Sequence, residues 1–191
     1  MVSAPALSFE LAPYDATPVP FTSLGLNPKL EQAVTDRGFV TTTPIQSAVY
    51  PGVLDRTDLV ACAQTGTGKT LAFLLPIMHR LMSAPPSQAA TTRVLILAPT
   101  RELAVQIEDE FQGLAYHTNL SSVAVYGGVE AGPQERGLRG AADIVGVTSY
   151  SYGAEHGFLT LVLAASAVLS IVWRGQPTAP ITVAAGTLAF L

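Results

Sequence analysis

The 191-residue chain is poor in cysteine, in charged residues and in positive charge. Its single cysteine, Cys62, excludes an internal disulfide, and its three histidines lack the sequence spacing of a metal site. Lys and Arg total 10 against 14 Asp and Glu, so the chain has no basic field of the kind that marks a nucleic-acid binder. Any contact with nucleic acid must therefore be local. The composition favours a reduced, cytoplasmic protein without a metal cluster.

The two ends of the chain differ in composition from its middle. Residues 1–20 contain four prolines and two acidic residues and lack a basic start, which predicts a flexible leader instead of a signal peptide. Hydrophobic residues make up 49% of the whole chain, and we locate the excess after Gly146. We therefore expect a leader at 1–20, an α/β domain at 21–147 and an apolar tail at 148–191.

Between these ends, helix and strand signals alternate. Helical spacing with start and stop residues predicts helices at 29–37, 45–54, 70–82 and 102–115. Short apolar runs predict strands at 59–63, 93–98, 122–126 and 143–147, the last preceded by a polar helical segment. Strands without polar alternation that are joined by helices predict a parallel sheet covered on both faces.

The strongest local signal is a glycine-rich run between an expected strand and an expected helix, Ala-Gln-Thr-Gly-Thr-Gly-Lys-Thr. In this context glycines let backbone N–H groups turn toward an anion, and the helix N-terminus adds a partial positive charge. Lys69 would reach the β- and γ-phosphates and Thr70 would ligate Mg²⁺, so these two are the candidate catalytic residues. The expected ATP contacts in this run are Ala63, Gln64, Thr65, Gly66, Thr67, Gly68, Lys69 and Thr70.

This run and the segments around it resemble the DEAD-box ATP-dependent RNA helicase family. Upstream, Thr43-Pro44-Ile45-Gln46 resembles the family's Q motif, with Phe21 as the isolated aromatic residue before it and Thr42 where the family usually has proline. The resemblance implies that Gln46 hydrogen-bonds the adenine edge and that Phe21 stacks on the base. A carboxamide suits this role because it offers both a donor and an acceptor. Without the motif, a core position for Phe21 would be an equal alternative.

Two downstream segments extend the resemblance. Pro99-Thr100-Arg101-Glu102-Leu103 matches the family's motif Ia, and Gly127-Gly128 matches its GG element. The resemblance implies contacts with the RNA backbone, which an arginine beside a helix N-terminus and a bare glycine backbone both suit. The expected RNA-binding residues are Pro99, Thr100, Arg101, Gly127 and Gly128. Glu102 has the simpler alternative of stabilising its own helix.

The resemblance covers residues 21–145 and stops within the last expected strand. Where the family continues as Thr-Pro-Gly-Arg, only Thr148 matches, and the sequence contains no Asp-Glu-Ala-Asp and no Ser-Ala-Thr. The expected fold class is therefore α/β, a truncated RecA-like P-loop layer whose parallel sheet has flanking helices and is followed by an apolar appendage.

The apolar tail has two interpretations. It contains the runs 158–173 and 181–191, and a membrane helix needs about 20 apolar residues, so the first run is slightly short. We favour a helical hairpin that associates with a membrane. The alternative is that segments rich in Val, Ile and Thr add strands to the sheet.

Three functions are consistent with these patterns. The first is an ATP-dependent RNA helicase by descent, with ATP and Mg²⁺ as cofactors and single-stranded or structured RNA as partner. The second is a fragment that binds nucleotide and RNA without turnover, and the third is a small membrane protein that carries a helicase segment. The missing acidic motif separates the first two and favours binding without hydrolysis.

Overall fold

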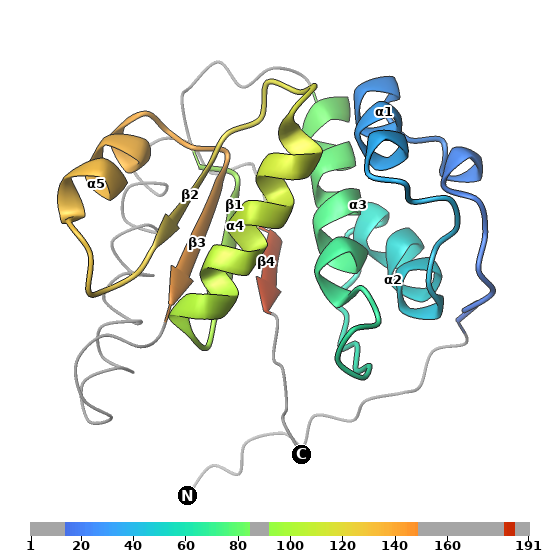
Figure 1. The fold of residues 1–191 in the computed structure, drawn as a ribbon. Coiled ribbons are helices and arrows are strands. Elements are labelled where there is room, and N and C mark those ends of the chain that lie inside the picture. The colour runs from blue at the N-terminus through green and yellow to red at the C-terminus, as the bar shows by residue number, and fades with distance from the viewer. Residues whose placement is uncertain (1–13, 85–91, 149–181, 186–191) are drawn as a thin grey trace, which may run out of the picture.

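The computed structural model of the chain describes residues 14–84, 92–148 and 182–185 (Figure 1). Helices and strands alternate along most of this length. In chain order the elements are a 3-10 helix η1 (Phe21–Leu24), α1 (Pro28–Asp36), α2 (Pro44–Leu54), α3 (Lys69–Ser83), β1 (Val94–Ala98), α4 (Arg101–Ala115), β2 (Ser122–Val125), α5 (Ala131–Arg139), β3 (Ile144–Thr148) and β4 (Thr182–Ala185). The four helices expected from the sequence are confirmed to within one or two residues.

The strands form a four-stranded sheet with the order β2-β3-β1-β4. All three neighbouring pairs are parallel, which confirms the predicted parallel α/β architecture. β1 and β3 are in register over their full lengths, from Val94 opposite Ile144 to Ala98 opposite Thr148. Because parallel strands require long connections, a helix lies between β1 and β2 and another between β2 and β3.

Local sequence explains where several helices begin. The Asn27 side chain accepts a hydrogen bond of 3.1 Å from Lys29 N, and Pro28 follows it at the first helical position. Thr100 caps α4 in the same way, with its hydroxyl accepting from Leu103 N at 3.2 Å. α2 likewise starts at a proline, Pro44. Each of these helices therefore begins at a residue type that suits a helix N-terminus.

The main core lies between the sheet and helices α3 and α4, which run alongside it in Figure 1. Alternate residues of β1 point to this side, and the others join a second apolar cluster with residues of β2 and β3 on the opposite side. α5 lies against β2, away from α1 and α2 (Figure 1). The largest fully buried side chains belong to Phe111, Leu30, Leu74, Leu75, Met78, Ile96, Leu114, Val34, Val145 and Pro76.

The prediction of a strand at 59–63 is wrong. These residues form no strand in the structure, and most of them are exposed, with Val60 at 76%. Both edges of the central strand β1 are paired, by β3 and β4, so residues 59–63 have no place beside β1. The Leu59 side chain instead packs against Gly52 of α2. The glycine-rich loop therefore follows an irregular segment and not a strand end.

The helical interpretation of the second tail run is also wrong where the structure describes it. Residues Thr182–Ala185 form β4 and pair in parallel with β1, from Val94 opposite Thr182 to Leu97 opposite Ala185. An open edge of β1 and a segment containing Thr and Val favour strand pairing over a helix. The first run, 158–173, lies outside the described residues. Within the described ranges, no helix is both long and apolar enough to cross a membrane.

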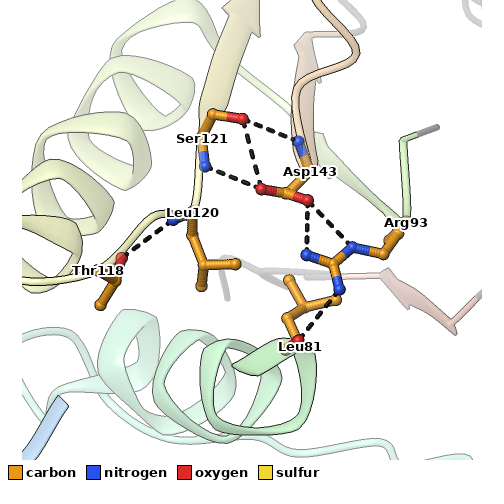
Figure 2. A network of polar contacts seen from close by, with 6 residues as sticks. All are labelled: Leu81, Arg93, Thr118, Leu120, Ser121 and Asp143. Atoms are coloured by element: carbon orange, nitrogen blue, oxygen red, sulfur yellow. Dashed lines mark hydrogen bonds and ion pairs between the residues drawn. The ribbon is translucent and has the colours of Figure 1, made fainter. Parts of the chain in front are cut away.

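A polar network ties the amino-terminal ends of β1 and β3 to the segment before β2 (Figure 2). Asp143 Oδ1 accepts hydrogen bonds from Arg93 Nε at 3.0 Å and Nη2 at 2.6 Å, while Arg93 Nη1 donates to Leu81 O at 3.0 Å. The other oxygen, Oδ2, accepts from Ser121 N at 3.0 Å. This network holds three chain segments and the last turn of α3 together.

Candidate functional site

The glycine-rich run forms a tight loop that leads into α3. Gly66 and Gly68 have φ angles of 78° and 81°, in the left-handed region that favours glycine. The space around Gly66 is open, since nothing lies within 4 Å of a Cβ placed there, whereas a Cβ on Gly68 would collide with Gln46 Nε2. Thr67 closes the loop from inside, its hydroxyl donating to Gln64 O at 2.8 Å. Both positions therefore favour glycine, and a larger residue at position 68 would also displace the side chain of Gln46.

Lys69 is the first residue of α3, and its side chain folds back over the loop. Its Nζ donates to Gln64 O at 2.8 Å and also to Ala63 O. Thr70 follows in the first helical turn and is half-buried. An ammonium group, a hydroxyl and the free N–H groups of a helix start are the donor set that a polyphosphate requires. An anion in the loop would replace the two carbonyl oxygens as the partner of Lys69.

Gln46, which is expected to hydrogen-bond the adenine edge, lies against this loop. It is 7% exposed, its Oε1 accepts from Thr43 N at 2.9 Å, and its Nε2 donates to Gly68 O at 3.2 Å. Thr43 adds a second link, because its hydroxyl donates to Thr67 O at 2.8 Å. The structure thus brings together two segments that are about twenty residues apart in sequence.

Sequence reasoning missed the structural roles of Thr42 and Thr43. Thr42 is 3% exposed, and its hydroxyl oxygen accepts from Val19 N at 2.9 Å and lies 2.6 Å from Ser47 Oγ. These contacts fix the segment just before α2 to the chain around Val19. Thr42 occupies the position where the family usually has proline. For Thr43 a signal was present, since Thr-x-x-Gln at a helix start is a capping-box pattern. For Thr42 no local pattern would have shown it.

Phe21 is placed differently from the other nucleotide candidates. It is 3% exposed and belongs to the main core, where its ring centroid lies 6.3 Å from that of Phe39. This packing agrees with the core alternative that the sequence left open. Stacking of Phe21 on a base stays a prediction.

The expected RNA contacts form a second cluster at the carboxyl-terminal ends of β1 and β2. Arg101 begins α4, and its Nη1 lies 3.4 Å from the position that a Cβ on Gly128 would take. Gly128 has a φ of 84°, while its neighbour Gly127 is half-buried. Thr100 immediately precedes Arg101 as the N-cap of α4. The Arg101 side chain, the N-terminus of α4 and the Gly127-Gly128 turn therefore lie together on one surface.

Glu102 lies beside this cluster and reduces its positive charge. A hydrogen bond from its own backbone N–H lowers the pKa of Glu102, and the nearby charge of Arg101 lowers it further. The two side chains approach to 3.4 Å, and both are more than half exposed. A negative charge in the first turn stabilises α4. Glu102 thus lies in the first turn of α4, where its charge suits the helix, while the N-cap itself is Thr100.

These features define a P-loop nucleotide-binding layer of the RecA-like α/β class. The comparisons with known proteins agree: the family model described as DEAD/DEAH box helicase matches residues 43–156, more than half of the chain. The chain belongs to this family. 

Individual relatives show the same likeness. The "Probable ATP-dependent RNA helicase DDX27" proteins of Mus musculus and Homo sapiens are each 45% identical over 125 residues, which cover 65% of this chain and 16% of the relative. "ATP-dependent RNA helicase SrmB" of Escherichia coli is 45% identical over 109 residues, covering 57% and 24%. The chain thus spans about a quarter or less of the length of these relatives.

Two solved structures resemble the fold. Prp28 of Chaetomium thermophilum bound to ADP has a TM-score of 0.62 and 38% identity, covering 68% of this chain and 32% of its own. Mss116 bound to single-stranded RNA and UDP-BeF has a TM-score of 0.63 and 30% identity, covering 69% and 28%.

Proposed function

We propose that the chain is an adenine-nucleotide-binding module that also contacts RNA phosphates. The observation that carries the proposal is the position of the Gln46 carboxamide, which is held between the N-cap of α2 and the last glycine of the phosphate loop. Adenine recognition and phosphate binding would therefore share one rigid unit. The adenine and RNA roles are supported by relatives whose names describe ATP-dependent RNA helicases.

Hydrogen-bond capacity explains why Gln46 would select adenine. A carboxamide has two N–H donors and two acceptor lone pairs. The protein uses one of each, through Gly68 O and Thr43 N, and these two bonds fix which way the amide points. One donor and one acceptor remain in a known orientation, which matches the edge of adenine and mismatches that of guanine.

The phosphate groups and the metal ion have a fitting donor set in this chain. Lys69 and the first N–H groups of α3 would hold the β- and γ-phosphates, and the Thr70 hydroxyl would be the protein ligand of Mg²⁺. Bound Mg²⁺ supplies neutralisation of phosphate charge. On nucleotide binding, Lys69 Nζ would exchange its hydrogen bonds to the carbonyl oxygens of Ala63 and Gln64 for bonds to the phosphates.

RNA contact is assigned to Arg101 and the Gly127-Gly128 turn. A guanidinium forms charge-assisted hydrogen bonds with phosphate oxygens, and a glycine backbone permits close approach. The short distance between Arg101 Nη1 and Gly128 supports a single phosphate-binding surface. The solved relative that was bound to single-stranded RNA supports the same proposal.

Titration of fluorescent ADP and GDP into the full 191-residue chain tests the nucleotide site. We expect tighter binding of ADP than of GDP, and loss of ADP binding in Lys69→Ala. Gln46→Glu tests the base selectivity, because a carboxylate keeps the acceptors but loses both donors. Equal affinity for ADP and GDP, or ADP binding that is unchanged in Lys69→Ala, would refute the proposed site.

Binding without hydrolysis is the second candidate for this polypeptide. Phosphoryl transfer by P-loop proteins needs an acidic residue at a strand end beside the Ser or Thr that holds Mg²⁺. After Asp143, the sequence contains a single further carboxylate, Glu155. We therefore expect phosphate release with saturating ATP, Mg²⁺ and RNA to equal that of Lys69→Ala. An RNA-stimulated excess that depends on Lys69 would contradict this second candidate.

A further inference from the structure

The side chain of Gln134 in α5 forms two hydrogen bonds with the main chain of Tyr126. Its Oε1 accepts a hydrogen bond from Tyr126 N, and its Nε2 donates one to Tyr126 O, both at 3.1 Å. Both residues are half-buried. A carboxamide has the same donor and acceptor groups as a peptide unit, so this pair replaces one rung of backbone pairing at the end of a strand.

The position of Tyr126 explains the importance of these two hydrogen bonds. β2 ends at Val125, whose register partner in β3 is Val147. β2 is the outer strand of the sheet, so on its other edge it has no strand neighbour among the described elements. Gln134 therefore provides the bonds that direct the chain as it leaves the sheet.

A close helix–strand contact puts Gln134 within reach. A Cβ on Gly137 would lie 2.8 Å from Val123 Cγ2, so α5 can approach β2 this closely only because residue 137 is glycine. Gln134 lies three residues earlier, on the same face of the helix. The contact at Gly137 sets the distance between helix and strand, and Gln134 then reaches the main chain beyond the strand end.

The next two residues after Tyr126 are Gly127 and Gly128, the turn that faces Arg101. Gly128 has a φ of 84° and lies close to Arg101 Nη1. A two-glycine turn has unusual conformational freedom, so its path depends on what holds its ends. We infer that Gln134 is a positioning residue that fixes this turn against Arg101 and so shapes the RNA phosphate site. This inference rests on the proposed RNA contact of Arg101 and Gly128.

The test compares four single variants and one double variant of the full chain in binding to a fluorescein-labelled oligouridylate, followed by anisotropy over a series of salt concentrations. Gln134→Met keeps the side-chain length and removes both hydrogen bonds, while Gln134→Glu keeps only the acceptor. Arg101→Ala tests the surface itself. Gln32→Met is the matched control, because it makes the same change at an exposed glutamine that donates a hydrogen bond to Asp36 in its own helix. ADP affinity and the melting temperature are measured on each.

We expect Gln134→Met to weaken RNA binding at least threefold and to leave the affinity for ADP unchanged. The control Gln32→Met should bind both RNA and ADP as the wild type does. The slope of log affinity against log salt should become shallower by about 0.7, the value for one phosphate contact on a single strand. Gln134→Glu should fall between the wild type and Gln134→Met. The double variant with Arg101→Ala should bind no more weakly than Arg101→Ala alone, because Gln134 acts through that residue.

Each other outcome has a definite meaning. If Arg101→Ala weakens RNA binding but Gln134→Met does not, the inference is overturned and the proposed RNA contact stands. If Gln134→Met lowers RNA and ADP affinity together with the melting temperature, Gln134 is a general stability residue and the inference is also overturned. If Arg101→Ala leaves RNA binding unchanged, the proposed RNA contact itself fails.

Discussion

Arg93 holds one carboxylate oxygen of Asp143 with two hydrogen bonds, from Nε at 3.0 Å and from Nη2 at 2.6 Å. The two side chains are mostly buried, at 24% and 19% exposed, and lie fifty residues apart in sequence. The pair stands where β1 and β3 begin, and the second oxygen of Asp143 holds Ser121 (Figure 2). Asp143 thereby connects three strands through one carboxyl group.

We therefore expect Asp143→Asn to lower the free energy of unfolding by about 2 kcal/mol, because it removes a charge-assisted pair from a partly buried network. Urea unfolding of the full chain measures this change. Glu135→Gln is the control, since the Glu135–Arg139 pair has a similar distance of 2.6 Å but is 59% and 77% exposed. The control should lose less than about 0.5 kcal/mol. Equal losses in both variants would show that the Asp143 network contributes no more than a surface pair.

The two glycines of the phosphate loop predict different responses to alanine. Both have φ near 80°, so alanine is strained at either position. Gly68→Ala in addition collides with the carboxamide of Gln46, whereas Gly66→Ala meets open space. We expect Gly68→Ala to weaken ADP binding more than Gly66→Ala does, by about tenfold or 1.4 kcal/mol. ADP titration of both variants measures the difference, and equal effects would mean that Gln46 does not constrain the loop.

Gly146→Ala should stabilise the protein by about 0.5–1 kcal/mol, because glycine in the middle of a strand has a high entropic cost of ordering. The nearest atom to an added Cβ is Ala124 Cα at 3.9 Å, an ordinary contact, and Gly146 borders a small gap in the core lined also by Leu74 and Phe111. Gly25→Ala is the control, since it has equal room but a φ of 62°. Thermal unfolding should show opposite signs for the two variants. Destabilisation by Gly146→Ala would indicate that the gap is too small for a methyl group.

His79 predicts a loss of stability in mild acid. Its Nδ1 accepts a hydrogen bond of 3.1 Å from Asn27 N, which requires a neutral ring nitrogen, and burial lowers the pKa of His79 below its usual value near 6.5. The unfolded chain therefore binds a proton at a higher pH than the folded one. This contribution to stability is complete above about pH 6.5 and is lost as the pH falls below it.

The melting temperature between pH 7.5 and 5.5 measures this effect. We expect a steeper fall in the wild type than in His79→Asn, whose amide oxygen replaces the Nδ1 acceptor without titrating. All other titrating groups contribute equally to both proteins and cancel in the comparison. Parallel curves would show that His79 does not control the acid response.

Much of the local structure around the candidate site could be predicted, because it depends on residues that are adjacent in the sequence. The run from Ala63 to Thr70 carries its glycines, its lysine and its hydroxyl in adjacent positions, and Asn27 and Thr100 mark helix starts through bonds to residues two or three positions away. Such interactions depend on neighbours in the sequence, so a pattern of residue types is enough to predict them. The same is true of the helix ranges.

Only the tertiary structure decided the pairing of distant groups. Residues 59–63 have the apolar character of a strand, yet both edges of β1 are occupied by β3 and β4, and one of these partners comes from the tail. Likewise, Gln46 bonds to Gly68 only because α2 packs against the phosphate loop. Gln134 bonds to Tyr126 only because α5 packs against β2. Strand propensity states that a segment can pair, but the choice of partner depends on long-range competition for a limited number of sheet edges, which no local pattern encodes.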